Sequence, residues 1–492
     1  MESKSEIQNF YSGANVFITG ATGFLGRVLV EKLLRSCPDV GNIYLLVRTK
    51  KGKNLHERVE NLLEDVIFDG LKENDPKFRH KITPIEGDVA LKDLGINEQD
   101  RKLLTTEVSI VFHAAATVNF NEKLKIAVPI NVCGTRDVLK LCHEMSNLKA
   151  VIHVSTAYSN CNQNVTEEKF YPTPIPPTKL IELVEVLPDE LQEKITKGIL
   201  KDFPNTYAYT KAIAENVVLE ESSGLPIAIF RPAIVTSTYK EPIKAWINNL
   251  YGATGVIAGA YTGVLRVLQC NGDNFANIVP ADMTVNAMIS IAWDIQNVKN
   301  DSNSNIPIYN FDLTSQQPLT WNRFMTDTEK YGLNYPTIHA MWYYSFFLTT
   351  NKLIYLVSFF FLHYLPAIFG DLFLMITMKK PRLVKFYKKV QTFSSVLIHF
   401  CIIHFQFKSY KVREMIERMS VEDRTLFFCD LKKLDIEEYL KSLIPGIRVY
   451  LLKDSLNTLP QALKKWKRLY WCHQFMKIVA LLIIVRIIFW FY

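Results

Sequence analysis

Residues 19–26 have the sequence Thr-Gly-Ala-Thr-Gly-Phe-Leu-Gly and follow a short β-prone apolar run, Asn15–Thr19. A helical apolar stripe comes next, formed by Phe24, Leu25, Val28, Leu29 and Leu33. Strand, glycine turn and helix in this order predict a dinucleotide cradle, where one glycine makes the tight turn, the next admits the pyrophosphate and the third allows close helix packing. The predicted cofactor contacts of this stretch are Gly20, Thr22, Gly23, Phe24, Leu25 and Gly26.

The end of the second predicted strand, Asn42–Val47, distinguishes between the two nicotinamide cofactors. An acid at this position would bind the ribose 2′-hydroxyl of NAD, whereas a cation accommodates a 2′-phosphate. Arg48 stands here, followed by Lys50, Lys51 and Lys53, and no acid occurs before Glu57. A planar guanidinium suits phosphate oxygens. The sequence therefore favours NADPH, and a solvated basic turn is the alternative.

Further β-prone runs follow at the spacing of repeated βα units, which predicts an α/β fold with a doubly wound parallel Rossmann sheet. Four runs end in residues suited to line a crevice at the carboxyl edge of that sheet: Gly87-Asp88-Val89, His113-Ala114-Ala115-Ala116, Ser155-Thr156 and Arg231-Pro232. We expect Asp88 to hydrogen-bond the adenine, and His113 and His153 to be scaffold residues rather than catalysts. The other predicted cofactor contacts are Val89, Ala114, Ala115, Pro232 and Val235.

The candidate catalytic pair lies in the pentapeptide Tyr207-Ala208-Tyr209-Thr210-Lys211. Positions i and i+4 share one face of a helix, so the Lys211 ammonium can lie beside the Tyr207 phenol. A nearby positive charge lowers a phenol pKa from about 10 toward the working pH, where proton transfer is most effective. A hydroxyl of Ser155 or Thr156, at a strand end upstream, could bind the same carbonyl oxygen. Asn131 lies in the helix that follows the alanine-rich strand end.

The last third of the chain is more apolar. Tyr343–Met378 is strongly aromatic and aliphatic, but Lys352, His363, Pro366 and Asp371 interrupt it, which favours buried or interfacial helices over a membrane span. The terminal Phe475–Tyr492 is the better candidate for a membrane helix, although Arg486 is an obstacle to full insertion. The preceding cations, interleaved with aromatic residues, are typical of an interfacial anchor: Lys464, Lys465, Trp466, Lys467, Arg468, Tyr470 and Trp471.

Composition excludes several other classes. The formal net charge is +8, but the basic residues gather beside apolar segments, so membrane lipid or the phosphates of a ligand explain them better than nucleic acid. The eight cysteines form no Cys-x-x-Cys pair, which predicts free thiols in a reducing compartment and no metal site. Met1–Glu6 carries no apolar signal region.

The glycine motif, Tyr207–Lys211 and the strand end Val154–Tyr158 together resemble the extended short-chain dehydrogenase/reductases. Within that group, Val16–Gly26 and Leu33–Pro38 look like alcohol-forming fatty acyl-CoA reductases, most similar to insect members. The similarity extends into the last third, through Leu365-Pro366-Ala367, Asp371 and Lys380–Val384, and so covers nearly the whole chain.

The resemblance implies roles for individual residues. Tyr207 would protonate the substrate oxygen, and Lys211 would lower the pKa of Tyr207 and hold the nicotinamide ribose. Thr156 would fix the carbonyl, with Ser155 as the alternative, and Asn131 would order a proton relay. The implied reaction converts long-chain fatty acyl-CoA through an aldehyde to a primary alcohol, with two NADPH used and CoA released.

The resemblance also implies an organisation and a location. We expect an NADPH-binding Rossmann domain at residues 1–340, with a proline-rich insertion at Asn160–Pro204 as a substrate wall or a surface excursion. A helical domain would follow at 341–460 and an anchor with its membrane helix at 461–492. The catalytic part would face the cytosol at the endoplasmic reticulum or the peroxisome. Two alternatives remain: a membrane-associated hydroxysteroid dehydrogenase, and a non-catalytic NADPH-binding scaffold for lipid assemblies.

Overall fold

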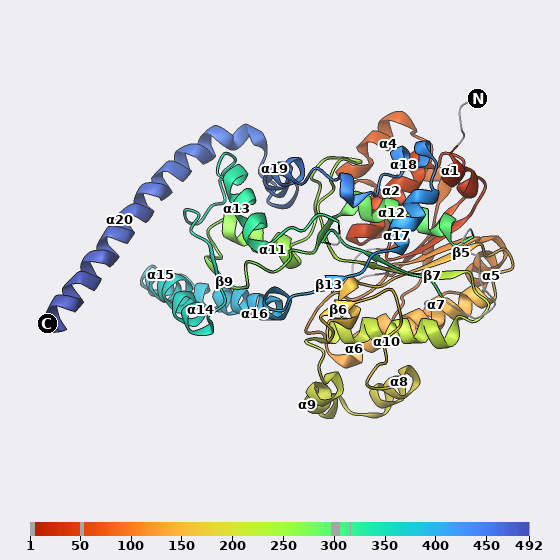
Figure 1. The fold of residues 1–492 in the computed structure, drawn as a ribbon, viewed down its shortest axis with the longest axis horizontal. Helices are drawn as coiled ribbons and strands as arrows, with labels where there is room; N and C mark the ends of the chain where they lie inside the picture. Colours follow the sequence, from red (N-terminus) through yellow and green to blue (C-terminus); the bar gives the residue numbers. More distant parts are fainter. Residues whose placement is uncertain (1–4, 50–53, 297–305, 315, 492) are drawn as a thin grey trace. The chain divides into compact units, whose positions relative to one another are not determined.

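The computed structural model describes residues 5–49, 54–296, 306–314 and 316–491 (Figure 1). The sequence predictions at Lys50, Lys51, Lys53 and Tyr492 lie outside these residues. The chain folds into two compact units, each made of three segments. The first comprises Met1–Lys244, Asn277–Pro318 and Phe405–Leu434, and the second comprises Ala245–Ala276, Leu319–His404 and Asp435–Tyr492. The domain division predicted at residues 340 and 460 stays a prediction, since compactness alone does not test it.

A seven-stranded, fully parallel sheet forms the centre of the first unit, in the order β11-β7-β5-β4-β1-β2-β3. Six of its seven strands are buried along their whole length on both faces, as expected for apolar runs in a parallel sheet. The order reverses between β1 and β4, which is the switch point where such sheets bind ligands. The strands are β1 (Val16–Thr19), β2 (Ile43–Val47), β3 (Ile82–Glu86), β4 (Ile110–His113), β5 (Ala150–Val154), β7 (Ile227–Pro232) and β11 (Ile308–Phe311).

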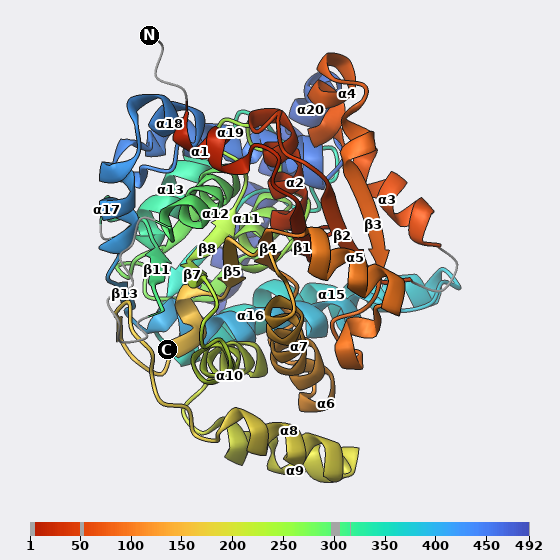
Figure 2. The same cartoon turned by 90° about the vertical axis from the view of Figure 1, so that its right-hand side faces the viewer.

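Helices cover both faces of this sheet, so the predicted doubly wound Rossmann fold is confirmed. Helices α2 (Phe24–Ser36) and α12 (Ala281–Asp294) contact each other on one face (Figure 2). Helices α7 (Gly134–His143) and α10 (Thr206–Glu221) contact each other on the opposite face. A π-helical turn, Pro129–Cys133, leads into α7.

Shorter elements complete the first unit. The predicted insertion at residues 160–204 contains α8 and α9, which contact α6. Two small parallel sheets pair β6 (Val165–Thr166) with β13 (Gln406–Phe407) and β8 (Ile234–Thr236) with β10 (Ile278–Pro280). The remaining helices are α1 (Glu6–Tyr11), α3 (Leu55–Leu63), α4 (Asp69–Asn74), α5 (Glu98–Glu107), α6 (Leu124–Val128), α8 (Pro177–Val186), α9 (Asp189–Leu200), α17 (Lys411–Arg418) and α18 (Val421–Leu426).

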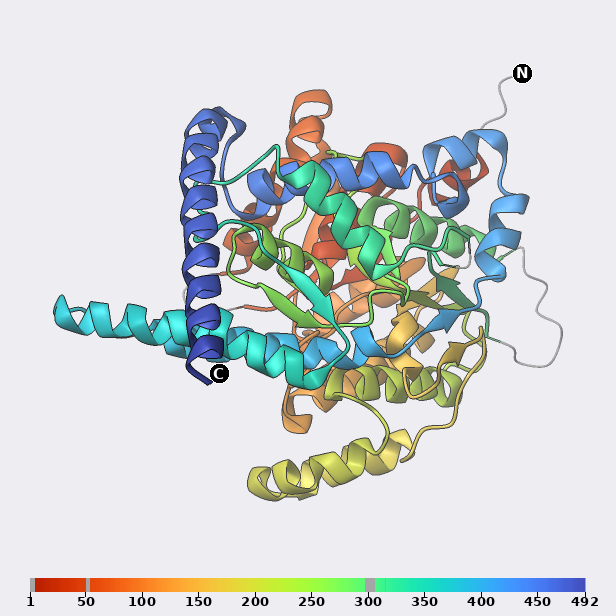
Figure 3. The same ribbon diagram turned by 60° about the vertical axis from the view of Figure 1, so that its left-hand side comes forward.

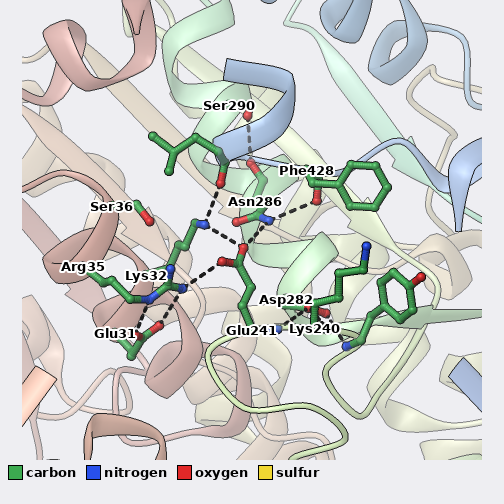
Figure 4. Close-up of polar contacts among 12 residues, drawn as sticks. Glu31, Lys32, Arg35, Ser36, Lys240, Glu241, Asp282, Asn286, Ser290 and Phe428 are labelled. Carbon is green, nitrogen blue, oxygen red and sulfur yellow. Dashed lines mark hydrogen bonds and ion pairs between the residues drawn. The ribbon is translucent and has the colours of Figure 1, made fainter. Parts of the chain in front are cut away.

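A buried polar network ties the late segment 405–434 into this first unit (Figure 4). The Lys32 ammonium, from α2, donates to Glu241 Oε1 at 2.6 Å and to the Leu426 carbonyl at 2.7 Å. The Asn286 amide, from α12, donates to the same Glu241 oxygen at 2.9 Å and to the Phe428 carbonyl at 3.0 Å. Since Lys32 is only 2% exposed, its charge depends on these partners, and the network holds the returning segment in place.

The second unit is mostly helical, as predicted for the C-terminal part of the chain. Helix α13 packs on α19, and α15 packs on α16. Its one small sheet pairs β9 (Val267–Gln269) with β12 (Phe347–Thr349). Its helices are α11 (Gly252–Tyr261), α13 (Trp321–Gly332), α14 (Lys352–Phe359), the π-helical turn η6 (Phe360–Tyr364), α15 (Leu365–Ile376), α16 (Leu383–Ile402), α19 (Ile436–Gly446) and α20 (Leu459–Phe491).

Two helical segments of this unit are long and apolar enough to cross a membrane. One is Leu456–Trp490, with a mean hydropathy of 2.0 and none of its apolar window buried, which includes most of the predicted terminal membrane helix. The other is Lys352–Ile376, with a mean hydropathy of 1.8 and 22% of its window buried. Because most of this second segment is exposed, it is not a buried helix, and both the interfacial helix and the membrane span stay open at this point.

Candidate active site

The glycine turn brings the end of β1 against the residues that follow β4. Gly20 has a φ of +80°, and a Cβ added there would lie 2.7 Å from the Ala115 nitrogen and 2.8 Å from the Ala114 carbonyl carbon. A Cβ on Gly26 would lie 2.2 Å from the Gly20 carbonyl oxygen. Two glycines are therefore required by close backbone approach, as a dinucleotide cradle demands. The residues present therefore fit a dinucleotide cofactor.

The first turn of α2 begins at this cradle. Gly23 is the N-cap of α2 and has no side chain to occupy the helix end. Phe24, Leu25 and Gly26 form the first turn, whose N–H groups and dipole favour a phosphate. Ala114 and Ala115 are held beside the turn by Thr19, whose carbonyl accepts from Ala114 at 3.2 Å and whose hydroxyl accepts from Ala115 at 3.2 Å. The structure thus brings the predicted glycine and alanine contacts together.

Arginines gather next to the cradle at the end of β2. Arg48 lies 3.8 Å from the Asp88 carboxylate, and its side chain is 50% exposed. Arg58, on α3, donates to the Arg48 carbonyl and to the Thr22 hydroxyl, the latter at 3.4 Å. Burial and the neighbouring Arg48 charge lower the pKa of Arg58, which still keeps its charge at neutral pH. Arg58, which directly follows the acid at position 57, was not predicted from the sequence.

The acid at position 57 performs a structural task instead. Asn54 is the N-cap of α3, and its side chain accepts from the Glu57 backbone at 2.8 Å. The Glu57 carboxylate in turn accepts from the Asn54 backbone at 3.1 Å, which completes a capping box. The Asn-x-x-Glu pattern was the available signal. The pattern shows that Glu57 caps α3, so the next residue, Arg58, is the candidate for a contact with the cofactor.

Three further predicted cofactor contacts lie at nearby backbone positions. The Val89 carbonyl faces Gly134 of α7, where an added Cβ would lie 2.7 Å away. Pro232 is the last residue of β7, at the carboxyl edge of the sheet. Val235 lies in β8, outside the seven-stranded sheet, where it pairs with Val279. The part these three residues play in cofactor binding stays a prediction.

Tyr207 and Lys211 lie on α10 as the spacing predicts, but the electrostatics differ from the expectation. Burial raises the pKa of Tyr207 to about 12, and a hydrogen bond with the Thr156 side chain acts in the opposite direction. The Lys211 ammonium donates to the Val154 carbonyl at 2.6 Å, and burial lowers its pKa to about 8. The desolvation of the phenol outweighs any effect of Lys211, so the predicted lowering of the Tyr207 pKa is not what this structure shows.

The two adjacent hydroxyls at the end of β5 have separate partners. Ser155 donates to the Glu215 carboxylate at 2.5 Å, and Glu215 forms a buried ion pair with Arg231 at 2.6 Å. The Thr156 side chain instead lies close enough to Tyr207 to lower the pKa of the phenol, and its hydroxyl accepts from the Tyr158 backbone at 3.3 Å. The structure therefore places Thr156 beside the phenol and joins Ser155 to a buried scaffold. The sequence analysis missed the Glu215–Arg231 pair, which connects α10 with β7.

Asn131 connects the π-helical turn before α7 with the helix of the candidate catalytic pair. Its amide donates to the Thr210 hydroxyl at 2.9 Å, and its side-chain oxygen accepts from the Thr117 backbone at 2.9 Å. Asn131 is 1% exposed. Thr210 lies between Tyr207 and Lys211, so Asn131 fixes the position of this part of α10.

The two histidines predicted to be scaffold residues are both buried. His113 bonds to the Thr19 hydroxyl at 2.8 Å and to the Thr135 hydroxyl at 3.1 Å, and burial lowers its pKa to about 3. His153 packs 5.4 Å from it, between ring centroids, and its ring nitrogens have no hydrogen-bond partner among the described residues. Within the described ranges, no group of three or more His, Cys, Asp and Glu residues is placed to hold a metal ion.

A doubly wound parallel sheet with a glycine turn at its switch point defines a dinucleotide-binding protein of the Rossmann type. Comparison with known proteins agrees. A family model for the NAD-binding region, described as "Male sterility protein", matches residues 18–288, and a second model of the same description matches residues 362–454.

Named relatives extend along nearly the whole chain. It is 42% identical to the fatty acyl-CoA reductase wat of Drosophila melanogaster over 473 residues, which is 96% of this chain and 91% of the relative. It is 37% identical to fatty acyl-CoA reductase 1 of Mus musculus over 463 residues, which is 94% of this chain and 89% of the relative. The chain therefore belongs to the fatty acyl-CoA reductase family, as predicted.

Solved structures share the fold at much lower identity. The terminal R domain from the myxalamid PKS-NRPS biosynthetic pathway aligns with a TM-score of 0.59 and 18% identity, covering 89% of this chain and 91% of that domain. The reductase domain of a nonribosomal peptide synthetase from Mycobacterium tuberculosis gives 0.58 and 15%, covering 92% and 97%. These likenesses concern the fold alone.

Proposed function

We propose that this protein reduces long-chain fatty acyl-CoA to a primary fatty alcohol with NADPH, through an aldehyde and with release of CoA. The observation that carries the proposal is the placement of the Thr156 side chain beside the Tyr207 phenol, at the carboxyl end of β5. Two hydroxyl donors side by side can hold one carbonyl oxygen. The class of substrate rests on the fatty acyl-CoA reductases to which the chain is related.

The arginines beside the glycine turn support NADPH over NADH. Arg48 and Arg58 approach each other at the end of β2, where the cofactor's 2′ substituent would lie. A guanidinium matches a phosphate better than a hydroxyl, and the first acid that follows Arg48 in the sequence, Glu57, is bound in a capping box. Arg48 also pairs with Asp88. A contact of the adenine with Asp88 and a contact of the 2′-phosphate with Arg48 would therefore lie side by side.

The chain's own residues would manage the proton and the developing charge. Tyr207, with its pKa raised to about 12, stays protonated at neutral pH, which suits an acid that gives its proton to a strongly basic alkoxide. Thr156 would fix the substrate oxygen, and preset donors at that oxygen lower the barrier most. Lys211 would hold the nicotinamide ribose, and Asn131 would hold α10 in position. A bound NADPH would supply the hydride for each of the two reductions.

Membrane attachment completes the proposal. The apolar helix α20 would anchor the protein to membrane lipid, with the first unit on the cytosolic face of the endoplasmic reticulum or the peroxisome. Long acyl chains partition into bilayers, so an anchored enzyme would meet its substrate there. In this arrangement residues 1–340 would bind NADPH and substrate, residues 341–460 would form the helical domain, and residues 461–492 would form the anchor.

One assay tests this function. Purified full-length protein in detergent receives a long-chain acyl-CoA with NADPH or with NADH, and the products are identified by mass spectrometry. We expect fatty alcohol and free CoA with NADPH, at a rate at least about 100-fold lower in Tyr207→Phe. In a parallel reaction with a hydroxysteroid and NADP⁺, oxidation of the steroid without acyl-CoA reduction in the first reaction would replace the proposal with a hydroxysteroid dehydrogenase, and cofactor binding without turnover would indicate a scaffold.

A further inference from the structure

The segment Lys352–Ile376 turns a broad apolar surface away from the unit to which it belongs. Helices α14 and α15, joined by the turn η6, form a rod at the edge of the second unit (cyan in Figure 3). Its outward side chains are large and exposed, and Phe369, Phe373 and Ile376 are 63%, 66% and 79% exposed. Soluble surfaces rarely carry a continuous apolar face of this kind. Further members are Leu353, Ile354, Leu356, Val357, Phe360, Phe361, Ile368, Leu372, Met375 and Met378.

The opposite side of the same rod is packed against the second unit. The buried residues recur at every fourth position: Tyr355, Phe359, His363, Ala367 and Asp371. Tyr355 and Phe359 form a small core with Val267 of β9, and residues of α16 pack against it. The rod therefore has two different faces: the stripe with aromatic and polar residues packs against the protein, and the most apolar face is exposed.

Polar anchors fix this stripe in place. The His363 ring accepts from the Arg266 backbone at 3.0 Å through Nε2, and its Nδ1 bonds to the Phe359 carbonyl at 3.2 Å. The Asp371 carboxylate accepts from three backbone N–H groups at the start of α16, at 2.8, 2.8 and 2.9 Å. A helix that crossed a bilayer as an independent span would break these bonds and leave a histidine and a carboxylate in hydrocarbon.

Exposed cations follow directly on the apolar face. The residues from 377 to 402 contain no acid, and Asp371, the nearest carboxylate, is occupied in capping α16. Apolar side chains beside a basic run are the combination that binds an anionic lipid surface, where the cations meet headgroups and the apolar face enters the acyl boundary. The exposed cations are Lys379, Lys380, Arg382, Lys385, Lys388 and Lys389.

We propose that α14 and α15 lie in the plane of an anionic membrane, inserted by their apolar face, and do not cross it. This proposal rests on the proposed membrane attachment through α20 and adds a second, in-plane lipid contact to it. The partner is a lipid surface rather than a protein, because the adjoining charge is uniformly positive. The anchors at His363 and Asp371 keep the rod on its unit while the outward side chains enter the lipid.

The first test is topological and uses the full chain in sealed vesicles from expressing cells. Single cysteines replace Lys352 and Lys379, at the two ends of the rod, in a background where the exposed Cys472 is serine. A membrane-impermeant maleimide is added from outside. We expect both ends to label on the side where Val186→Cys, an exposed position of the first unit, labels. Labelling of the two ends from opposite sides would make the segment a span and overturn the proposal.

The second test measures contact with lipid. An environment-sensitive dye is attached at Phe373→Cys, at Ile483→Cys in α20 and at Val186→Cys, in protein reconstituted into phosphatidylcholine–phosphatidylserine vesicles with spin-labelled lipid. We expect quenching at 373 and 483 and none at 186. Quenching at 483 alone would overturn the in-plane contact and leave the anchor intact, and quenching at neither would overturn both. A dye at 373 that is shielded from water but not quenched would mean that protein, such as a second copy, covers the face.

A charge control completes the design. The triple variant Lys385→Gln, Lys388→Gln and Lys389→Gln should reduce quenching at 373 in vesicles that contain phosphatidylserine, and change little in phosphatidylcholine alone. A matched triple variant of exposed lysines in the first unit, Lys179→Gln, Lys194→Gln and Lys197→Gln, should have no effect. An equal loss in both triple variants, or no loss in the first, would overturn the role of anionic lipid.

Discussion

The hydroxyl of Ser155 donates a hydrogen bond to the buried carboxylate of Glu215 at 2.5 Å, while the side chain of the neighbouring Thr156 lies beside the Tyr207 phenol and lowers its pKa. Two adjacent hydroxyls at one strand end therefore belong to different systems. The Ser155 hydroxyl bonds to Glu215, which forms a buried ion pair with Arg231. The Thr156 side chain lies beside the Tyr207 phenol. Because their partners differ, substitutions of Ser155 and of Thr156 should have different measurable effects.

Removal of each hydroxyl should have a different effect. Thr156→Val should lower kcat about 100-fold, because one preset donor at the substrate oxygen is lost. Ser155→Ala should lower the free energy of unfolding by about 1–3 kcal/mol, since the Glu215 carboxylate loses a buried partner. Steady-state kinetics and chemical denaturation of both variants provide the measurements. A large loss of kcat in Ser155→Ala with unchanged stability would assign the substrate oxygen to Ser155.

The phenol of Tyr207 should be the acid of the reaction. Tyr207→Phe should lower kcat by about 100-fold to 10,000-fold, since proton transfer to the substrate oxygen loses its donor. NADPH affinity, followed by fluorescence titration, should stay within a few-fold of the natural protein. Tyr209→Phe, on the same helix, is the matched control, because its hydroxyl is buried without a hydrogen-bond partner among the described residues. Equal activity losses in both variants would argue against a special role for Tyr207.

Cofactor choice should depend on two arginines. Arg48→Ala and Arg58→Ala should each raise the KM for NADPH about 10-fold to 100-fold, because a charge-assisted contact with the 2′-phosphate contributes about 1.5–3 kcal/mol. The KM for NADH should change little. Arg79→Ala, whose guanidinium pairs with Glu60 and Glu64 instead, is the control for a general loss of positive charge. If NADH and NADPH lose affinity equally, the 2′-phosphate is not bound here.

The close approach at Gly26 should be intolerant of a methyl group. Gly26→Ala would place Cβ 2.2 Å from the Gly20 carbonyl oxygen and 2.6 Å from the Ala21 Cα, both of them backbone atoms. We expect loss of cofactor binding and a lower free energy of unfolding by about 1–3 kcal/mol, the usual cost of overpacking. Gly198→Ala in α9 meets nothing within 4 Å and should be neutral or slightly stabilising. Calorimetry of the two variants would show any departure from this contrast.

The pH dependence should report Lys211. Burial lowers its pKa to about 8, so the ammonium that would hold the ribose is present below that pH and is lost above it. We expect kcat/KM for NADPH, which reports groups of the free enzyme, to fall as the pH rises through about 8. In Lys211→Met this alkaline decrease should disappear, on a much lower plateau. A decrease that persists unchanged in Lys211→Met would assign the titration to another group.

Short-range sequence patterns were sufficient to predict the fold of the first unit. The glycine spacing at residues 20, 23 and 26 and the βα alternation predicted the cradle and the sheet, because strand and helix periodicity is written locally. The i, i+4 spacing predicted that Tyr207 and Lys211 share one helix face, and the family resemblance supplied their roles. Arg58 was missed, since its approach to Thr22 joins positions 36 residues apart. The buried Glu215–Arg231 pair was missed for the same reason.

The sequence by itself determined the nucleotide-binding fold and the apolar character of the last third, because these follow from local residue spacing, and its motifs carried the resemblance to the family. Only the tertiary structure decided which hydroxyl faces Tyr207, that burial raises the pKa of Tyr207, and that the Lys352–Ile376 rod exposes its apolar face. Each of these depends on which distant residues exclude water from a group or leave it open. Desolvation and partner choice are properties of the packed chain, and no local spacing encodes them.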